Sequence, residues 1–250
     1  MSAYLEIDAP VAELVFDDPD RMNAMTAAMF DGLESALATL AAREDVVVVI
    51  VRGNGRAFSA GFDLRSASND VAILESFILR LSGVCRGLRR LPQVVIAAVH
   101  GAAIAGGCAV LSACDLAVVA PKAKIGYPVH ILGISPAVSF PTLQKSIGPG
   151  PARALQLSGE RIDGATAHAL GLASHLAQDA ETVLPTTRAL AATIAGHGPN
   201  ALRVTKRWLN TLDGTDRDAA YDAVAIDTAR AATGEETRER LAAFWGQRGG

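Results

Sequence analysis

Apolar residues recur along the chain with two different periods, and the period predicts the type of element. Short apolar runs over residues 4–7 and 12–16, joined by Asp8-Ala9-Pro10, predict a β-hairpin at the start of the fold. From Thr26, a candidate N-cap, apolar residues return every three or four positions to about residue 42, which predicts an amphipathic helix. Residues 46–51 are a continuous β-branched run and predict a strand that is buried on both faces.

The middle of the chain alternates strands and helices, which predicts an α/β fold. A helix over roughly residues 70–91 ends before Pro92, a strand follows at 94–99, and a helix of small residues leads to a strand at 115–119. Residues 94–114 carry no formal charge over a length that could span a bilayer. Their β-branched start and the break at His100-Gly101 predict a strand, a turn and a helix instead, so we expect no membrane span.

The last part of the chain changes character. A Gly- and Pro-rich stretch over residues 126–141 interrupts the alternation, and the short helices after it end at Gly159 and Gly171, both candidates for the C′ position. From about residue 199 the pattern is wholly helical, with further helices at about 216–232 and 235–246. We therefore expect an α/β core over residues 1–197 and a helical region over residues 198–250.

Composition and charge narrow the class of protein. Half of the 250 residues are apolar and 20% are charged, which suits a large buried core. A formal net charge of −3 argues against nucleic-acid binding driven by counterion release. Cys85, Cys108 and Cys114 have no metal-like pair spacing and indicate reduced thiols, and the first eight residues lack the pattern of a signal peptide. We expect a cytoplasmic protein without a metal site.

Two segments rich in small residues are candidates for binding a ligand through the backbone. In the first, residues 58–64, peptide N–H groups can point at a ligand oxygen because small side chains let it approach. The second, residues 101–108, is a Gly-rich turn that opens a helix, whose first amides form an anion site. Taken separately, each is more typical of a tight turn and close packing. Neither carries a phosphate-loop or dinucleotide fingerprint.

These two segments belong to a larger set of motifs, and the order and spacing of the whole set along the chain are informative. The motifs are residues 19–25, 49–64, 94–101, 106–108, 114–115 and 159–163, and the central pair reads Phe58-Ser59-Ala60-Gly61-Phe62-Asp63-Leu64 and Gly106-Gly107-Cys108. Together they resemble the crotonase superfamily, the enoyl-CoA hydratase/isomerase family, over nearly the whole chain. The resemblance implies a crotonase-like spiral of ββα units, with a helical C-terminal region that builds homotrimers or dimers of trimers.

The resemblance also implies an acyl-CoA thioester as ligand, with coenzyme A as part of the substrate and no separate cofactor. By position, the backbone N–H groups of Ala60 and Gly106 correspond to the family's oxyanion hole for the thioester carbonyl. The resemblance assigns substrate and coenzyme A binding to Met22, Ala24, Ala60, Gly61, Phe62, Asp63, Leu64 and Gly106. Candidate contacts for the phosphates, each also typical of a solvated surface charge, are Arg21, Arg65, Lys206 and Arg207.

The sequence departs from the family where its hydratases carry two catalytic glutamates. The first position holds Ala109 and the second holds Val129. A third position, used by the isomerase and dehalogenase branches, falls near Ala137. None of these side chains can transfer a proton, so the sequence does not support hydration through a pair of carboxylates.

Two residues near these positions remain as candidates for proton transfer. His130 adjoins the second glutamate position, and histidine is a common general acid or base in enzymes. In an extended segment, however, its side chain would point to the side opposite Val129. Tyr127 can donate a hydrogen bond to a substrate oxygen. For both residues a structural role is the more common alternative.

The sequence leaves three functional hypotheses open. The first is an acyl-CoA enzyme of lyase or isomerase type that stabilises a thioester enolate, with the proton handled by a noncarboxylate group, a bound water or the substrate. Decarboxylation or carbon–carbon cleavage fits this description. The second is a noncatalytic acyl-CoA-binding protein. The third is an oligomeric scaffold or partner subunit.

Overall fold

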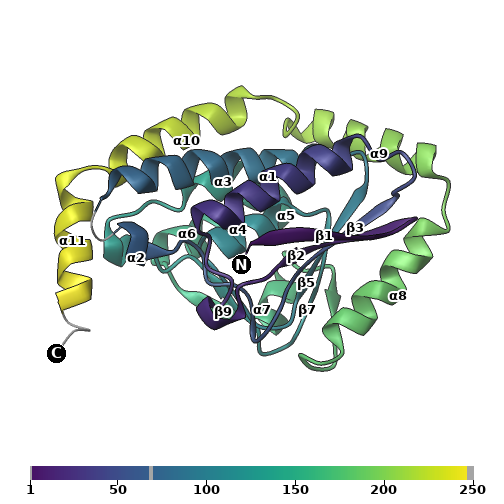
Figure 1. The fold of residues 1–250 in the computed structure, drawn as a ribbon, viewed down its shortest axis with the longest axis horizontal. Helices are drawn as coiled ribbons and strands as arrows, with labels where there is room; N and C mark the ends of the chain where they lie inside the picture. The colour runs from purple at the N-terminus through teal and green to yellow at the C-terminus, as the bar shows by residue number, and fades with distance from the viewer. Residues whose placement is uncertain (1, 68–69, 247–250) are drawn as a thin grey trace.

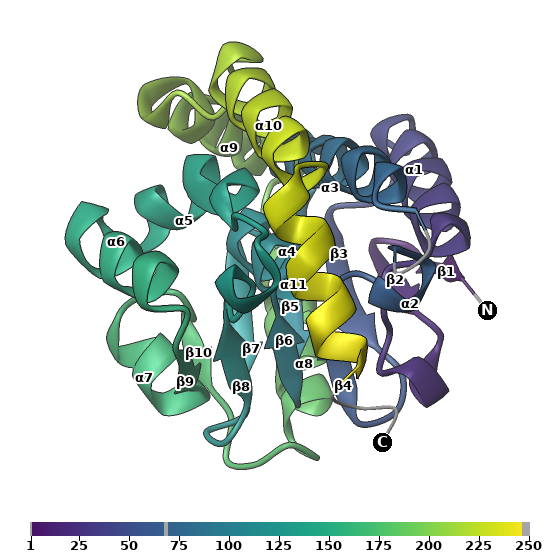
Figure 2. The ribbon, with the colours of Figure 1, turned by 90° about the vertical axis from the view of Figure 1, so that its left-hand side faces the viewer.

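The structure, a computed structural model, describes residues 2–67 and 70–246. Two sheets lie at its centre and helices surround them (Figures 1 and 2). The larger sheet has the strand order β1-β2-β3-β5-β7-β10. Its first two strands form the expected antiparallel hairpin, and the others continue in parallel. The strands are β1 (Ala3–Asp8), β2 (Val11–Phe16), β3 (Val48–Gly53), β5 (Val94–Val99), β7 (Leu116–Val119) and β10 (His175–Leu176).

The smaller sheet has the order β4-β6-β8-β9 and was not predicted from the sequence. Its strands are β4 (Ala57–Ser59), β6 (Ala102–Ile104), β8 (Lys124–Gly126) and β9 (Arg161–Asp163). β4, β6 and β8 each follow a strand of the larger sheet along the chain, and each leads into helices, so that a ββα unit occurs three times. This confirms the α/β spiral. Strands of three residues in Gly- and Ala-rich segments have too little periodicity to be recognised alone.

The helices of the core begin and end where the local signals predict. α1 (Ala27–Ala41) begins after Thr26, whose side-chain oxygen accepts a hydrogen bond from Met29 N–H at 3.1 Å. Gly159 and Gly171 have φ values of 65° and 86°, and this left-handed conformation confirms them as the residues that follow their helices. The other helices before residue 170 are α2 (Leu64–Ala67), α3 (Ala72–Arg90), α4 (Gly106–Ala113), α5 (Phe140–Ile147), α6 (Pro149–Ser158) and α7 (Gly164–Ala169).

Four helices complete the chain: α8 (Val183–Ala195), α9 (Pro199–Asp213), α10 (Ala219–Ala232) and α11 (Glu235–Gly246). α8 packs against β3, β5 and β7, and α10 lies along α3 (Figure 1). α11 crosses in front of the smaller sheet (Figure 2) and packs against residues 130–132. Among the described residues, no helix combines the length and apolar character needed to cross a membrane. Cys85, Cys108 and Cys114 are buried and form no disulfide among the described residues.

Candidate functional site

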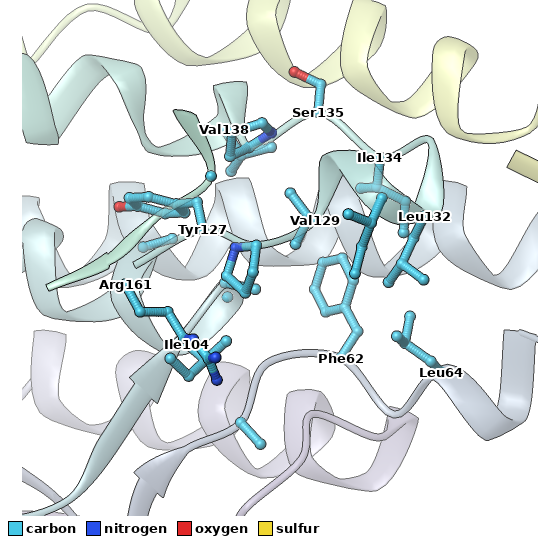
Figure 3. Close-up of a pocket in the computed structure, with 18 of the residues that line it drawn as sticks. Phe62, Leu64, Ile104, Tyr127, Val129, Leu132, Ile134, Ser135, Val138 and Arg161 are labelled. Carbon is cyan, nitrogen blue, oxygen red and sulfur yellow. The ribbon is translucent and has the colours of Figure 1, made fainter. Parts of the chain in front are cut away.

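A cavity of about 1020 Å³ lies between the smaller sheet, α3, α4 and the segment after β8 (Figure 3). A volume of this order suits a small-molecule ligand. Most of its lining is apolar, including Phe62, Leu64, Ile104, Val129, Leu132, Ile134 and Val138. Charged lining residues are Lys124, Glu160 and Arg161. No group of three metal-ligating side chains occurs in the described part of the chain.

The loop after β4 is held by backbone hydrogen bonds to residues 22–25. Ala60 N–H donates to Met22 O at 2.9 Å. Met25 N–H donates to Gly61 O at 2.7 Å, and Asp63 N–H donates to Met25 O at 3.1 Å. The last two bonds make a parallel bridge between Met25 and Phe62. In such a bridge the N–H of Phe62 points away from Met25.

This bonding pattern corrects the expected pair of backbone donors. Ala60 is the wrong donor, because Met22 O already accepts its N–H. The N–H of Phe62 has no hydrogen-bond partner among the described residues. Gly106 N–H likewise has no partner there, because Gly106 is the first residue of α4 and the first N–H groups of a helix lack intrahelical acceptors. The available donors are therefore Phe62 N–H and Gly106 N–H.

These two donors lie on segments that touch each other. A Cβ built on Gly61 would lie only 2.9 Å from Ile104 O and 3.2 Å from Gly106 N. Gly61 also has φ 86°, which favours glycine. Glycine at residue 61 therefore allows the loop that carries Phe62 to approach the N-terminus of α4. Two unpartnered N–H groups at one edge of an apolar cavity form the arrangement that stabilises a developing oxyanion.

The residue before the second donor has a strained backbone. Ala105, the N-cap of α4, has φ 52° and ψ −111°, a conformation that residues with a side chain rarely adopt. Its N–H donates to Gly126 O at 2.8 Å, and its carbonyl accepts Ala109 N–H at 3.0 Å. Bonds on both sides hold this conformation and so fix the direction of Gly106 N–H.

A buried asparagine supports the first donor loop, a role that no local sequence pattern indicates. The Asn23 side chain accepts Asp18 N–H at 2.8 Å. It donates to Asn54 O and Ala57 O, at 2.9 and 2.8 Å. Ser59 Oγ donates to Asn23 O at 2.8 Å. These bonds fix the ends of β4 against the segment that contacts the Phe62 loop.

The three positions at which the resemblance implies catalytic carboxylates lie at or near the cavity. Ala109 and Val129 line it, whereas Ala137 does not and its neighbour Val138 does. Ala109 is buried and Val129 is half-buried. The side chains at residues 109 and 129 are therefore apolar parts of the cavity wall.

Neither candidate for proton transfer presents a polar atom to the cavity. His130 begins a 3-10 helix (His130–Leu132), is exposed, and lies outside the cavity lining next to Gly159. Tyr127 lines the cavity with its ring, but its hydroxyl is buried and points away from Phe62 and Val129 (Figure 3). Burial raises the pKa of Tyr127 well above its ordinary value, so this hydroxyl stays protonated. The proton-transfer role expected for either residue is not supported.

The expected binding residues divide into two groups. Met22, Ala60, Phe62, Leu64 and Gly106 line the cavity, whereas Ala24, Gly61 and Asp63 do not. Asp63 accepts Arg65 N–H at 3.2 Å and forms an ion pair with Arg21 at 3.8 Å.

Lys206 is the wrong candidate for a phosphate contact. It is buried, its Nζ lies 2.6 Å from Asp115 Oδ2, and it donates to Gln93 O at 2.8 Å. Burial lowers the pKa of Lys206, although Asp115 acts in the opposite direction. This lysine fastens α9 to the core. Arg65 and Arg207 are exposed, and their phosphate contacts remain predictions.

Comparison with known proteins finds relatives along almost the full chain. A family model described as enoyl-CoA hydratase/isomerase matches residues 6–248. The crotonyl-CoA hydratase of Syntrophomonas wolfei is 30% identical over 244 residues, which cover 96% of this chain and 93% of the relative. The mitochondrial Delta(3,5)-Delta(2,4)-dienoyl-CoA isomerase of Dictyostelium discoideum is 29% identical over 253 residues, which cover 95% and 86%.

Solved structures share the fold. An enoyl-CoA hydratase/isomerase from Mycobacterium paratuberculosis superposes with a TM-score of 0.87 at 26% sequence identity. The match covers 96% of this chain and 97% of the other. An enoyl-CoA hydratase/isomerase from Xanthobacter autotrophicus superposes with a TM-score of 0.87 at 25% identity and covers 99% and 97%.

Proposed function

This chain belongs to the enoyl-CoA hydratase/isomerase family, and we propose that it binds an acyl-CoA thioester in the cavity and stabilises the enolate of that thioester. The observation that carries the proposal is the pair of unpartnered N–H groups, Phe62 and Gly106, on touching segments at the cavity. Negative charge that develops on the thioester oxygen is stabilised by donors already in place. One such donor typically contributes about 10²–10³ in rate.

The proposed reaction uses no carboxylate of the protein. Glu160, the one acidic residue among the described lining residues, is exposed and directly precedes β9. Ala109 and Val129 are apolar, and neither His130 nor Tyr127 offers a polar atom to the cavity. We therefore assign the proton to a bound water or to the substrate itself. Hydration by a pair of glutamates is not part of the proposal.

Decarboxylation or another carbon–carbon cleavage is the reaction type that fits the apolar lining of the cavity best. In a decarboxylation the bond from the α-carbon to the carboxylate carbon breaks and CO₂ leaves. The electron pair becomes the enolate, whose oxygen accepts from the two N–H groups, and water then returns a proton to the α-carbon. A carbanion formed by bond breaking needs no strong base.

A second candidate function is binding without catalysis. The observation that favours it is the apolar cavity wall at Ala109 and Val129, which keeps a pocket for an acyl chain and removes the usual proton donors. Such a protein would bind acyl-CoA thioesters and release them unchanged.

The experiment that tests the proposal combines a calorimetric titration with butyryl-CoA and a hydration assay with crotonyl-CoA. We expect saturable binding of butyryl-CoA and slow hydration of crotonyl-CoA. Absence of butyryl-CoA binding by the folded protein would contradict the proposal. Fast crotonyl-CoA hydration would contradict the reaction type and leave the acyl-CoA site standing.

We also propose that this protein is cytoplasmic. We propose further that it assembles as a homotrimer or a dimer of trimers through residues 198–250. The supporting observation is an exposed apolar face on α9, made of Val204, Trp208, Leu209 and Leu212, which are 45–80% exposed. Contiguous apolar residues on a surface helix mark a protein contact. The family resemblance supplies the stoichiometry.

A further inference from the structure

One side of the cavity wall is cationic. Arg161 in β9 and Lys124 in β8 line the cavity, and Glu160 is the one acidic residue among the described lining residues. Ala109 and Val129, which also line the cavity, are apolar and add no negative charge to it. An anionic group that enters this cavity is therefore attracted by two cations.

Strand register brings Arg161 toward the backbone donors. Arg161 pairs with Gly126 of β8, and Gly126 pairs with Ile104 of β6. Two strand spacings place the Arg161 backbone about 10 Å from Ile104, which stands two residues before Gly106. Because Gly126 has no side chain, the Arg161 side chain extends across β8 toward Ile104 (Figure 3). Lys124 lies on the same face, two residues before Gly126.

Both cations lack an anionic partner within the described residues. Neither Arg161 nor Lys124 forms an ion pair there, although Glu160 is close in sequence. Asp163 stands directly opposite Lys124 in β9, but its carboxylate accepts Thr166 N–H at 2.8 Å and so caps α7. Two cations without an anionic partner beside an apolar cavity can attract and hydrogen-bond a carboxylate.

We infer that the cavity selects an acyl-CoA whose acyl group carries a second carboxylate, and that Arg161, with Lys124, binds this carboxylate. The inference rests on the proposed function, because it requires the thioester carbonyl to sit on Phe62 N–H and Gly106 N–H. The planar guanidinium of Arg161 can donate two parallel hydrogen bonds to a carboxylate. A purely aliphatic acyl chain gains nothing from either cation.

The test compares ligands that differ in this group alone. Calorimetry measures the Kd of glutaryl-CoA and of pentanoyl-CoA, which have the same number of acyl carbons, and succinyl-CoA with butyryl-CoA forms a second pair. We expect the wild type to bind the carboxylated ligand of each pair at least about tenfold more tightly. High salt should reduce this ratio, because both cations are exposed.

Variants separate the carboxylate contact from other roles. Arg161→Met should abolish the preference and change the Kd of pentanoyl-CoA by less than about threefold. Lys122→Met removes an exposed cation outside the cavity lining and should leave both Kd values unchanged. Arg161 is exposed and its side chain makes no hydrogen bond to a described residue, so the variant should fold, which circular dichroism checks.

Three outcomes would overturn the inference. If Arg161 contacts a phosphate of coenzyme A, Arg161→Met weakens the binding of glutaryl-CoA and of pentanoyl-CoA by the same factor. If the wild type binds the two ligands equally, the cavity does not select a carboxylate. Both results leave the proposed function intact. If neither ligand binds, the proposed function fails together with the inference.

Discussion

The candidate site depends, at the scale of single residues, on which backbone N–H groups remain unpaired and which glycines let them converge. The N–H of Ala60 donates to Met22 O. The bridge between Met25 and Phe62 leaves the N–H of Phe62 pointing away from Met25. Gly61, between Ala60 and Phe62, touches the start of α4. The arrangement therefore needs an absent side chain at residue 61 as much as it needs the donors.

Gly61→Ala is expected to weaken butyryl-CoA binding by about tenfold or more. The added Cβ meets Ile104 O and Gly106 N, and alanine is strained at φ 86°, so the two donor segments must separate. Calorimetry measures the Kd, and thermal unfolding checks the fold. Gly150→Ala is the matched control, because its Cβ would meet nothing within 4 Å. Unchanged affinity in a folded Gly61→Ala protein would contradict the proposed contact.

The sequence located this loop but not the right donor within it. Residues 58–64 form a recognisable motif, yet the direction of each N–H is set by pairing with Met22 and Met25, which are distant in the sequence. The same limit explains Arg161. Its place in the cavity follows from the pairing of β9 with β8, for which a strand of three residues gives no signal.

Whole elements are held in place by a few polar and strained residues. α4 follows its N-cap Ala105, whose positive φ costs roughly 1–3 kcal/mol. β2, β3 and α8 meet at Glu13, which accepts hydrogen bonds from Arg52 and Arg188. Both features make predictions for stability that do not depend on the ligand.

Ala105→Gly should raise the free energy of unfolding by about 1 kcal/mol, because glycine adopts φ 52° and ψ −111° without strain. The gain is the relieved strain minus the entropy that glycine adds to the unfolded chain. Urea denaturation measures it. Ala189→Gly, at an exposed position inside α8, is the control and should lower stability by about 0.5–1 kcal/mol. Destabilisation by both variants would refute the strain at residue 105.

The Glu13 cluster predicts a pH dependence of stability. Burial raises the pKa of Glu13, but hydrogen bonds from Arg188 and Arg52 outweigh burial and bring it below the ordinary 4.5. Because the pKa of Glu13 is lower in the folded state than in the unfolded state, ionised Glu13 stabilises the fold at pH values above its unfolded-state pKa. This stabilisation is lost as the pH falls through the folded-state pKa. Glu13→Gln should therefore destabilise the protein at pH 7 and much less in acid. Urea denaturation across this range measures the difference.

The control for the Glu13 prediction is Glu6→Gln. Glu6 is half exposed and contacts Arg52 at 3.1 Å, so its removal should change stability little at either pH. An equal loss of stability for Glu13→Gln at neutral and acid pH would contradict the account of this cluster.

A helix or strand could be predicted wherever its own residues show a hydrophobic period or include a capping residue. The hairpin, α1 with its Thr26 cap and the strand at residues 94–99 were all predicted. β4, β6 and β8 were not, because each is three residues long and is stabilised by pairing with the next turn of the spiral. Non-local pairing of this kind is absent from any local window of sequence.

The helical region and the core form one body in the whole molecule. Lys206 of α9 makes an ion pair with Asp115 at the start of β7, and α10 packs along α3. The amphipathic pattern of α9 predicted the helix but not which of its charged residues is buried, so Lys206 was assigned to the surface. The face of α9 with Trp208 and Leu212 remains exposed on the single chain.

The oligomer is tested by charging this exposed face. Wild-type protein should sediment as a trimer or a hexamer, and a Trp208→Glu, Leu212→Glu double variant should sediment as a smaller species, since burying two carboxylates in an apolar contact is unfavourable. Leu157→Glu, at another exposed apolar position on α6, is the control and should leave the sedimentation coefficient unchanged. A monomeric wild type would contradict the assembly.

The central claim, that two backbone N–H groups hold a thioester carbonyl, has a direct spectroscopic test. Isotope-edited infrared difference spectroscopy of butyryl-CoA, labelled with carbon-13 at the thioester carbonyl, reports the strength of that C=O bond in the free and the bound ligand. Hydrogen bonds from Phe62 and Gly106 withdraw electron density toward the oxygen, so the carbonyl band should move to lower wavenumber on binding. A bound carbonyl band at the frequency of the free thioester would contradict the account.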